Sequence, residues 1–122
     1  MKRESTHRYP RTARLNELVH QIVAEELERL DDPRLDLVTV MSVEVDPDLR
    51  HATVVFDTPE GDQRDEEVLA ALHDHRVRLQ RAVGRQARIK RTPTLTFRPD
   101  VVERGAARVE DVLRHLHDEP NA

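Results

Sequence analysis

The sequence predicts an α+β domain in which helices cover one face of a three-stranded sheet. Three observations support this fold class. Apolar residues recur at helical spacing in three segments, β-branched residues gather in short runs, and proline-containing turns separate the segments. The predicted order of elements is α-β-β-α(α)-β-α, which is typical of an α+β sandwich. A length of 122 residues is enough for one domain with a single core.

The first helix is predicted to run from Thr12, as its N-cap, to about Leu30. Its apolar residues follow the i, i+3, i+4, i+7 pattern: Leu15, Leu18, Val19, Ile22, Val23, Leu27 and Leu30. The polar residues 1–10, which end in a proline, are expected to form a flexible tail. Arg11 and Arg14 would then lie at the start of this helix, where cations oppose the helix dipole. This misfit is either a weak sign of function or a small energetic cost.

Two strands are expected next, over residues 37–45 and 52–57, because both runs are rich in β-branched residues. The short turn between them, Asp46-Pro47-Asp48, favours an antiparallel hairpin. A third strand is expected over residues 94–98, with a proline on each side. Since proline cannot donate a backbone hydrogen bond, this strand suits the edge of the sheet.

Residues 65–90 follow a helical pattern that polar residues interrupt at 73–76. One helix and two helices with a kink both fit this pattern. A final helix is predicted over residues 101–117. The domain is therefore expected to span residues 11–117, and residues 118–122 are expected to form a flexible C-terminal tail.

Charge is distributed in blocks along a chain whose formal net charge is −4. Residues 76–98 carry eight basic side chains and no acidic one, whereas residues 15–75 carry four basic and seventeen acidic ones. One helical face would carry Arg78, Arg81, Arg85 and Arg88, and the opposite face Leu79, Ala82 and Val83. This pattern predicts a surface for a negatively charged partner. The alternative is a merely solvated face, because arginine outnumbers lysine 18 to 2 in the whole chain.

The residues that support catalysis or metal binding are absent or wrongly spaced. The chain has no cysteine, no phosphate-binding glycine loop and no nucleophile elbow. The histidine pairs at 73 and 75 and at 115 and 117 point about 200° apart on a helix, so neither pair suits one metal ion. We therefore expect no enzyme activity, no metal and no cofactor. No apolar run approaches the length of a membrane span, and the cysteine-free composition suits the cytoplasm.

Aromatic residues are scarce, with Tyr9, Phe56 and Phe97 as the full set. Both phenylalanines lie in predicted strands, where core packing is expected. Base stacking on aromatic side chains is therefore mostly unavailable. Contacts from arginine side chains to phosphates are the main mode expected for nucleic-acid binding.

Four motifs follow one another along the chain: Arg11-x-x-Arg14, Asp32-Pro33-Arg34-Leu35, Asp48-Leu49-Arg50-His51-Ala52, and Pro93-Thr94-Leu95-Thr96-Phe97 with Asp100. Together they resemble the bacterial ribosome-binding factor A family, over about residues 10–117. The resemblance implies a type II KH-like domain in a non-enzymatic factor. Such factors bind the 30S ribosomal subunit and 16S rRNA, assist late assembly and 5′-end processing of that RNA, and are associated with cold adaptation.

The expected RNA-binding residues are Arg76, Arg78, Arg81, Arg85, Arg88, Lys90 and Arg91, joined by Arg8, Arg11 and Arg14. The family carries an Ala-x-Gly kink between two helices, and the matching residues here, His75-Arg76-Val77, lack the alanine and the glycine. Either the bend is milder, or the two helices run as one.

The expected partners are the 30S subunit and 16S rRNA, bound by a monomer that has no small-molecule substrate and no membrane contact. The alternative function is a small acidic protein-interaction module with no RNA role. In that case the acidic residues 15–75 would meet a basic partner, and the arginines would be solvated.

Overall fold

The computed structural model describes the backbone of residues 2–118 and the side chains of residues 12–116. Its sheet has three strands, β1 (Thr39–Val45), β2 (His51–Asp57) and β3 (Thr94–Pro99), in the order β1-β2-β3. β1 and β2 form an antiparallel hairpin, and β3 lies parallel to β2 at the edge of the sheet. The predicted hairpin and the predicted edge strand are both confirmed.

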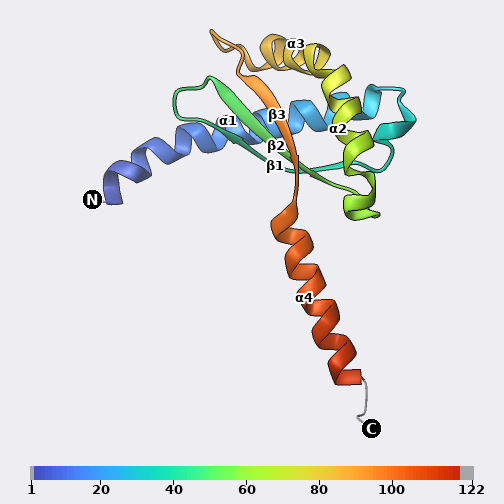
Figure 1. Cartoon of the computed structure of the whole chain (residues 1–122). Helices are drawn as coiled ribbons and strands as arrows, with labels where there is room; N and C mark the ends of the chain where they lie inside the picture. The colour runs from blue at the N-terminus through green and yellow to red at the C-terminus, as the bar shows by residue number, and fades with distance from the viewer. Residues whose placement is uncertain (1, 119–122) are drawn as a thin grey trace.

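Three helices cover one face of the sheet (Figure 1). They are α1 (Lys2–Arg29), α2 (Asp65–Asp74) and α3 (Arg76–Ala87). The core lies between these helices and the sheet, and its largest fully buried side chains are Val19, Val23, Val54, Phe56, Val68, Leu72, Leu79, Val83 and Leu95. Phe97 is also buried, so both phenylalanines serve the core as predicted. The α+β class and its three-stranded sheet are confirmed.

The first helix begins ten residues earlier than predicted. It starts at Lys2, so Pro10 lies inside α1 and Thr12 is not its N-cap. A proline removes one backbone hydrogen bond without forcing a helix to end, and residues 2–9 contain no other helix breaker. Arg11 and Arg14 are consequently not in the first turn, and the predicted conflict with the helix dipole is wrong. Flexibility of residues 1–10 stays a prediction.

Two helices, not one, occupy residues 65–87, and they meet at His75. His75 has φ −102° and ψ 9°, a conformation open to residues other than glycine. Its N–H donates to the carbonyl of Ala71, and its own carbonyl accepts from the N–H of Leu79. The kink is therefore present, within the predicted 75–77 region, without an Ala-x-Gly sequence.

The last helix, α4 (Val101–Asp118), does not pack on the sheet with the others but projects away from the domain (Figure 1). One residue, Asp100, separates it from β3, which is too short a connection to turn the chain back over the sheet. The Asp100 carboxylate caps the helix by accepting from the N–H of Glu103. Arg104 then anchors it, donating to Asp57 and Asp65 at 2.8 Å each. Residues 119–122, most of the predicted C-terminal tail, lie outside the described residues.

Candidate nucleic-acid interface

Helix α3 buries the predicted apolar face and exposes the predicted arginine side chains that lie within it, whereas Arg88 lies beyond the end of the helix. Leu79, Ala82 and Val83 are fully buried against α1 and the sheet. The opposite face carries Arg81 and Arg85, both exposed to solvent. The apolar face fixes the rotation of the helix, and this rotation directs the arginine side chains outward.

The segment after α3 folds back along the helix and carries three more exposed cations, Arg88, Lys90 and Arg91. Arg88 ends α3 in the left-handed conformation, with φ 54° and ψ 42°, which reverses the chain direction. Gly84 allows a close approach, since a Cβ at that position would lie 2.7 Å from the Thr92 hydroxyl. The side chain of Gln80 accepts from the N–H of Leu95 at 2.9 Å, which fixes the start of β3 to α3. These two contacts hold residues 92–95, the end of the loop, beside the helix.

We define the arginine face as the exposed cations of α3 and this loop: Arg81, Arg85, Arg88, Lys90 and Arg91. Among the side chains that the structure describes, no carboxylate forms an ion pair with any of the five. An unneutralised group of cations on one surface attracts a polyanion, and arginine is suited to phosphate oxygens. These five exposed cations are among the seven central residues that the sequence predicted as RNA-binding, and their role in binding stays a prediction.

Arg78 differs from its neighbours because it is paired. Its Nε donates to Glu26 of α1 at 3.0 Å, and Glu26 also accepts from Arg29 at 3.2 Å. Glu26 is almost completely buried, and the hydrogen bond from Arg78 lowers the pKa of its carboxyl group despite that burial. Arg78 therefore joins α1 to α3, and part of its charge is already neutralised. Arg76 is half-buried at the kink.

The N-terminal arginines are only partly placed. Arg14 is exposed on α1, while the side chains of Arg8 and Arg11 lie outside the described residues. α1 and α3 pack together and run in roughly opposite directions (Figure 1). The N-terminal half of α1, which carries Arg14, thus lies toward the C-terminal end of α3.

A group of four polar side chains surrounds the kink, and sequence reasoning did not find it. Asp32, in the loop after α1, accepts from His75 at 2.9 Å and from Arg34 at 2.7 and 3.1 Å. Arg34 also donates to Asp74 at 3.1 Å. The pKa of Asp32 is strongly lowered, first by Arg34 and then by His75. We call Asp32, Arg34, Asp74 and His75 the kink clamp. The Asp-Pro-Arg motif was the available signal, but in the sequence it served only as one of the motifs of the family resemblance and did not indicate these contacts.

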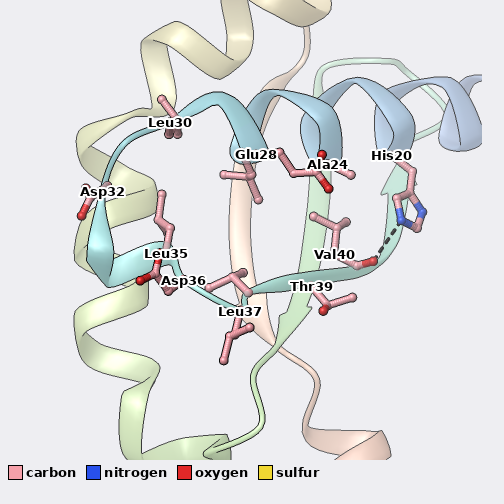
Figure 2. A pocket seen from close by; sticks show the side chains of 12 residues that line it. His20, Ala24, Glu28, Leu30, Asp32, Leu35, Asp36, Leu37, Thr39 and Val40 are labelled. Atoms are coloured by element: carbon pink, nitrogen blue, oxygen red, sulfur yellow. Dashed lines mark hydrogen bonds between the residues drawn. The ribbon is translucent and has the colours of Figure 1, made fainter.

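A second surface has the opposite charge. A cleft of about 530 Å³ lies between α1 and β1 (Figure 2). Its described lining includes Glu28, Asp32 and Asp36 and no lysine or arginine. His20 closes one end by donating from Nε2 to the carbonyl of Val40 at 2.9 Å. The cleft therefore repels phosphates, and it is not a candidate site for nucleic acid.

Two further features bear on the class of protein. Within the described residues, no group of three or more histidine, aspartate or glutamate side chains could hold a metal ion. In the same part of the chain, no helix is both long and apolar enough to cross a membrane. The fold and its exposed cations define a small α+β domain with one basic helical face.

Comparison with known proteins gives a consistent result. The family model described as ribosome-binding factor A matches residues 11–113. A relative with that name from Acidothermus cellulolyticus is 43% identical over 104 residues, which are 84% of this chain and 69% of that protein. The crystal structure of ribosome-binding factor A from Thermus thermophilus superposes with a TM-score of 0.66 at 34% identity, over 72% of this chain and 94% of that one. The chain belongs to the ribosome-binding factor A family.

One solved structure carries information about a partner. Coordinates of the Thermus thermophilus factor, fitted as a homology model into a cryo-EM map of its 30S complex, match this chain with a TM-score of 0.56 at 34% identity. The match covers 66% of this chain and 86% of that one. The Thermus thermophilus factor thus forms a complex with 30S.

Proposed function

We propose that this protein is a non-enzymatic ribosome maturation factor that binds the 30S subunit through 16S rRNA. The observation that carries the proposal is the arginine face, the five exposed cations of α3 and its following loop, none of which has an acidic partner among the described side chains. Family membership and the 30S complex of a relative support the same conclusion. In this role the protein assists late assembly of the subunit and 5′-end processing of 16S rRNA.

Binding rests on charge and shape. The arginine face neutralises clustered phosphates and releases their counterions, and its guanidinium groups match phosphate geometry. Both phenylalanines are buried, so within the described residues no phenylalanine or tyrosine is free to stack on a base. The protein therefore stabilises one conformation of the maturing RNA without making or breaking a bond. A monomer acting in the cytoplasm fits this role.

The first test reverses charge on the arginine face. The double variant Arg81→Glu/Arg85→Glu should weaken binding to isolated 30S subunits about 100-fold, or about 2.7 kcal/mol, because it removes two phosphate contacts and adds two repulsions. Arg78 is left intact, since its loss would also break the contact with Glu26. Fluorescence anisotropy at fixed salt measures the affinity, and circular dichroism checks the fold.

A matched control separates position from net charge. Arg108→Glu/Arg114→Glu makes the same charge change on α4, where both residues are exposed. We expect this variant to bind 30S subunits within about threefold of the wild type. Equal losses for the two variants would contradict the assigned surface. Complementation of a strain that lacks the gene, read as the fraction of 16S rRNA with an untrimmed 5′ end, tests the processing role.

The acidic protein-interaction module makes a different prediction. It requires the Arg81→Glu/Arg85→Glu variant to keep its 30S binding. It also requires substitutions in the cleft, such as Asp36→Asn, to abolish that binding. Co-sedimentation with intact 30S subunits and with protein-free 16S rRNA distinguishes the two functions, because only an RNA-binding factor pellets with the naked RNA.

A further inference from the structure

The kink between α2 and α3 has no residue that would make it by itself. Its three residues, His75, Arg76 and Val77, include neither glycine nor proline. His75 occupies a sparsely populated backbone region that nothing in its own chemistry favours over the helix. The local sequence permits one continuous helix over residues 65–87, so a force from outside the helices must hold the bend.

Burial of the apolar faces of both helices in the core supplies part of this force, and the kink clamp acts directly at the bend. Asp32 has only 11% of its side chain exposed, and it binds the imidazole of His75 and the guanidinium of Arg34 together. Arg34 reaches on to Asp74, the last residue of α2. Two side chains from the loop after α1 therefore hold the two residues at which α2 ends and the bend occurs.

The same loop is also attached to the beginning of α2. Arg64, directly before the helix, donates to the carbonyl of Arg34 at 2.7 Å and to the carbonyl of Asp36 at 2.8 Å. Both ends of α2 are thus tied to residues 32–36. Since the loop continues from α1, and α1 holds α3 through Glu26 and Arg78, all three helices are linked by polar contacts at the kink.

We propose that Asp32 and Arg34 are positioning residues that set the angle between α2 and α3 and thereby place the arginine face. The inference rests on the proposed RNA binding. Neither residue needs to touch RNA. Asp32 is largely covered, and it is ion-paired with Arg34 and hydrogen-bonded to His75, so it acts through the orientation of α3. Without the clamp, α2 and α3 gain access to a straighter arrangement that moves the five cations away from their common footprint.

The experiment measures the bend and the affinity in the same proteins. The chain has no cysteine, so spin labels can be placed at Ala70→Cys and Gln86→Cys, two exposed positions on either side of the kink. In a straight helix their Cα atoms would be about 24 Å apart, and the bend shortens this distance. Asp32→Asn should broaden the label-distance distribution toward longer distances and weaken binding to 30S subunits roughly five- to tenfold.

A matched control removes a comparable contact elsewhere. Asp57→Asn breaks a carboxylate–arginine pair at the base of α4, remote from the kink. Both variants lower the melting temperature, but only Asp32→Asn should change the label distance and the affinity. Asp32→Glu, which keeps the charge, should recover part of both. If Asp32→Asn does not fold, His75→Gln is the milder variant, and it should broaden the distance distribution in the same direction.

The results separate this inference from the proposed function. An unchanged label distance in Asp32→Asn, or affinity losses that follow melting temperature equally in Asp32→Asn and Asp57→Asn, would overturn the positioning role. A wild-type protein that binds neither 30S subunits nor 16S rRNA would overturn the proposed function. In that case the label distance still decides whether the clamp sets the angle between the helices.

Discussion

The arginine face and the α1–β1 cleft are built next to the same helix and differ in almost every physical respect. The arginine face lies on α3 and its following loop and carries five exposed cations. The cleft is concave and is lined by Glu28, Asp32, Asp36 and apolar side chains (Figure 2). The pairing of charges also differs. Arg78, the central arginine nearest to α1, is the one bound to a carboxylate, and the cations farther along α3 are not.

The contrast between these two surfaces explains how a protein with a negative net charge can present a basic surface. The formal net charge of −4 is a sum over basic and acidic regions of the chain. It therefore does not give the sign of the electrostatic potential at either surface. Apolar burial determines which side chains of α3 face outward, and the acidic residues that line the cleft come from α1 and the loop before β1. A polyanion is attracted at one surface and repelled at the other, which favours one orientation of the bound protein.

The largest effect should come from removing the support beneath the arginine face. Leu79 is fully buried under α3, so Leu79→Ala should reduce the free energy of unfolding by about 3 kcal/mol through lost burial and a cavity. Urea denaturation measures this change. Val77→Ala on the same helix is the control, because Val77 is 59% exposed and should cost less than about 0.5 kcal/mol. Similar losses for both variants would show that α3 is not held by its apolar face.

The next prediction compares the two surfaces directly by neutralising two charges on each. Arg81→Gln/Arg85→Gln should weaken 16S rRNA binding about 30-fold, or about 2 kcal/mol, and flatten the dependence of log Kd on log salt concentration by about 1.5. Glu28→Gln/Asp36→Asn in the cleft should change the affinity less than about twofold. A cleft variant that gained as much affinity as the arginine variant lost would mean that long-range charge, not contact, controls binding.

Glu26 lies between the two regions, and its replacement should weaken the packing of α1 on α3. Glu26→Gln should cost about 1.5 kcal/mol of stability at pH 7, a value limited by the exposure of both partner arginines. Because the folded-state pKa of Glu26 is lowered, the ionised carboxylate stabilises the fold above the unfolded-state pKa near 4.5. This contribution is lost as the pH falls through the folded-state pKa. The stability difference from wild type should be constant from pH 7 to about 5 and shrink below that.

The sequence predicted the faces of the helices better than their partners. The spacing of Leu79, Ala82 and Val83 was sufficient to orient α3, because burial of apolar residues depends on a local period. The pairing of Arg78 with Glu26 was missed, since the two residues are 52 positions apart and either could have met solvent instead. The contact between Asp32 and His75 spans 43 positions and was missed for the same reason.

Backbone geometry limited the predictions in another way. The kink at His75 depends on contacts from a distant loop, so the local residues left one helix and two helices equally open. The sequence pattern also did not predict the direction in which α4 leaves the domain. Its apolar stripe predicted a packed helix, whereas Val102 is 80% exposed and Leu116 67% exposed. The connection of a single residue between β3 and α4 limits the direction of the helix. The spacing of apolar residues along the helix carries no information about this direction.

The smallest effect separates charge from conformation at one residue of the arginine face. Arg88 holds a left-handed conformation that glycine adopts freely, and this conformation costs a residue with a Cβ about 1 kcal/mol. Arg88→Gly and Arg88→Ala remove the same charge, so both should weaken RNA binding by the same factor of about three to five. Only Arg88→Gly relieves the strain, and it should be about 0.5–1 kcal/mol more stable than Arg88→Ala in thermal and urea unfolding. If the glycine variant binds much more weakly than the alanine variant, the strained turn itself holds Lys90 and Arg91 in place. If the two variants bind RNA equally but differ in stability, the strained conformation does not contribute to binding. The arginine at position 88 would then contribute to binding through its charge alone.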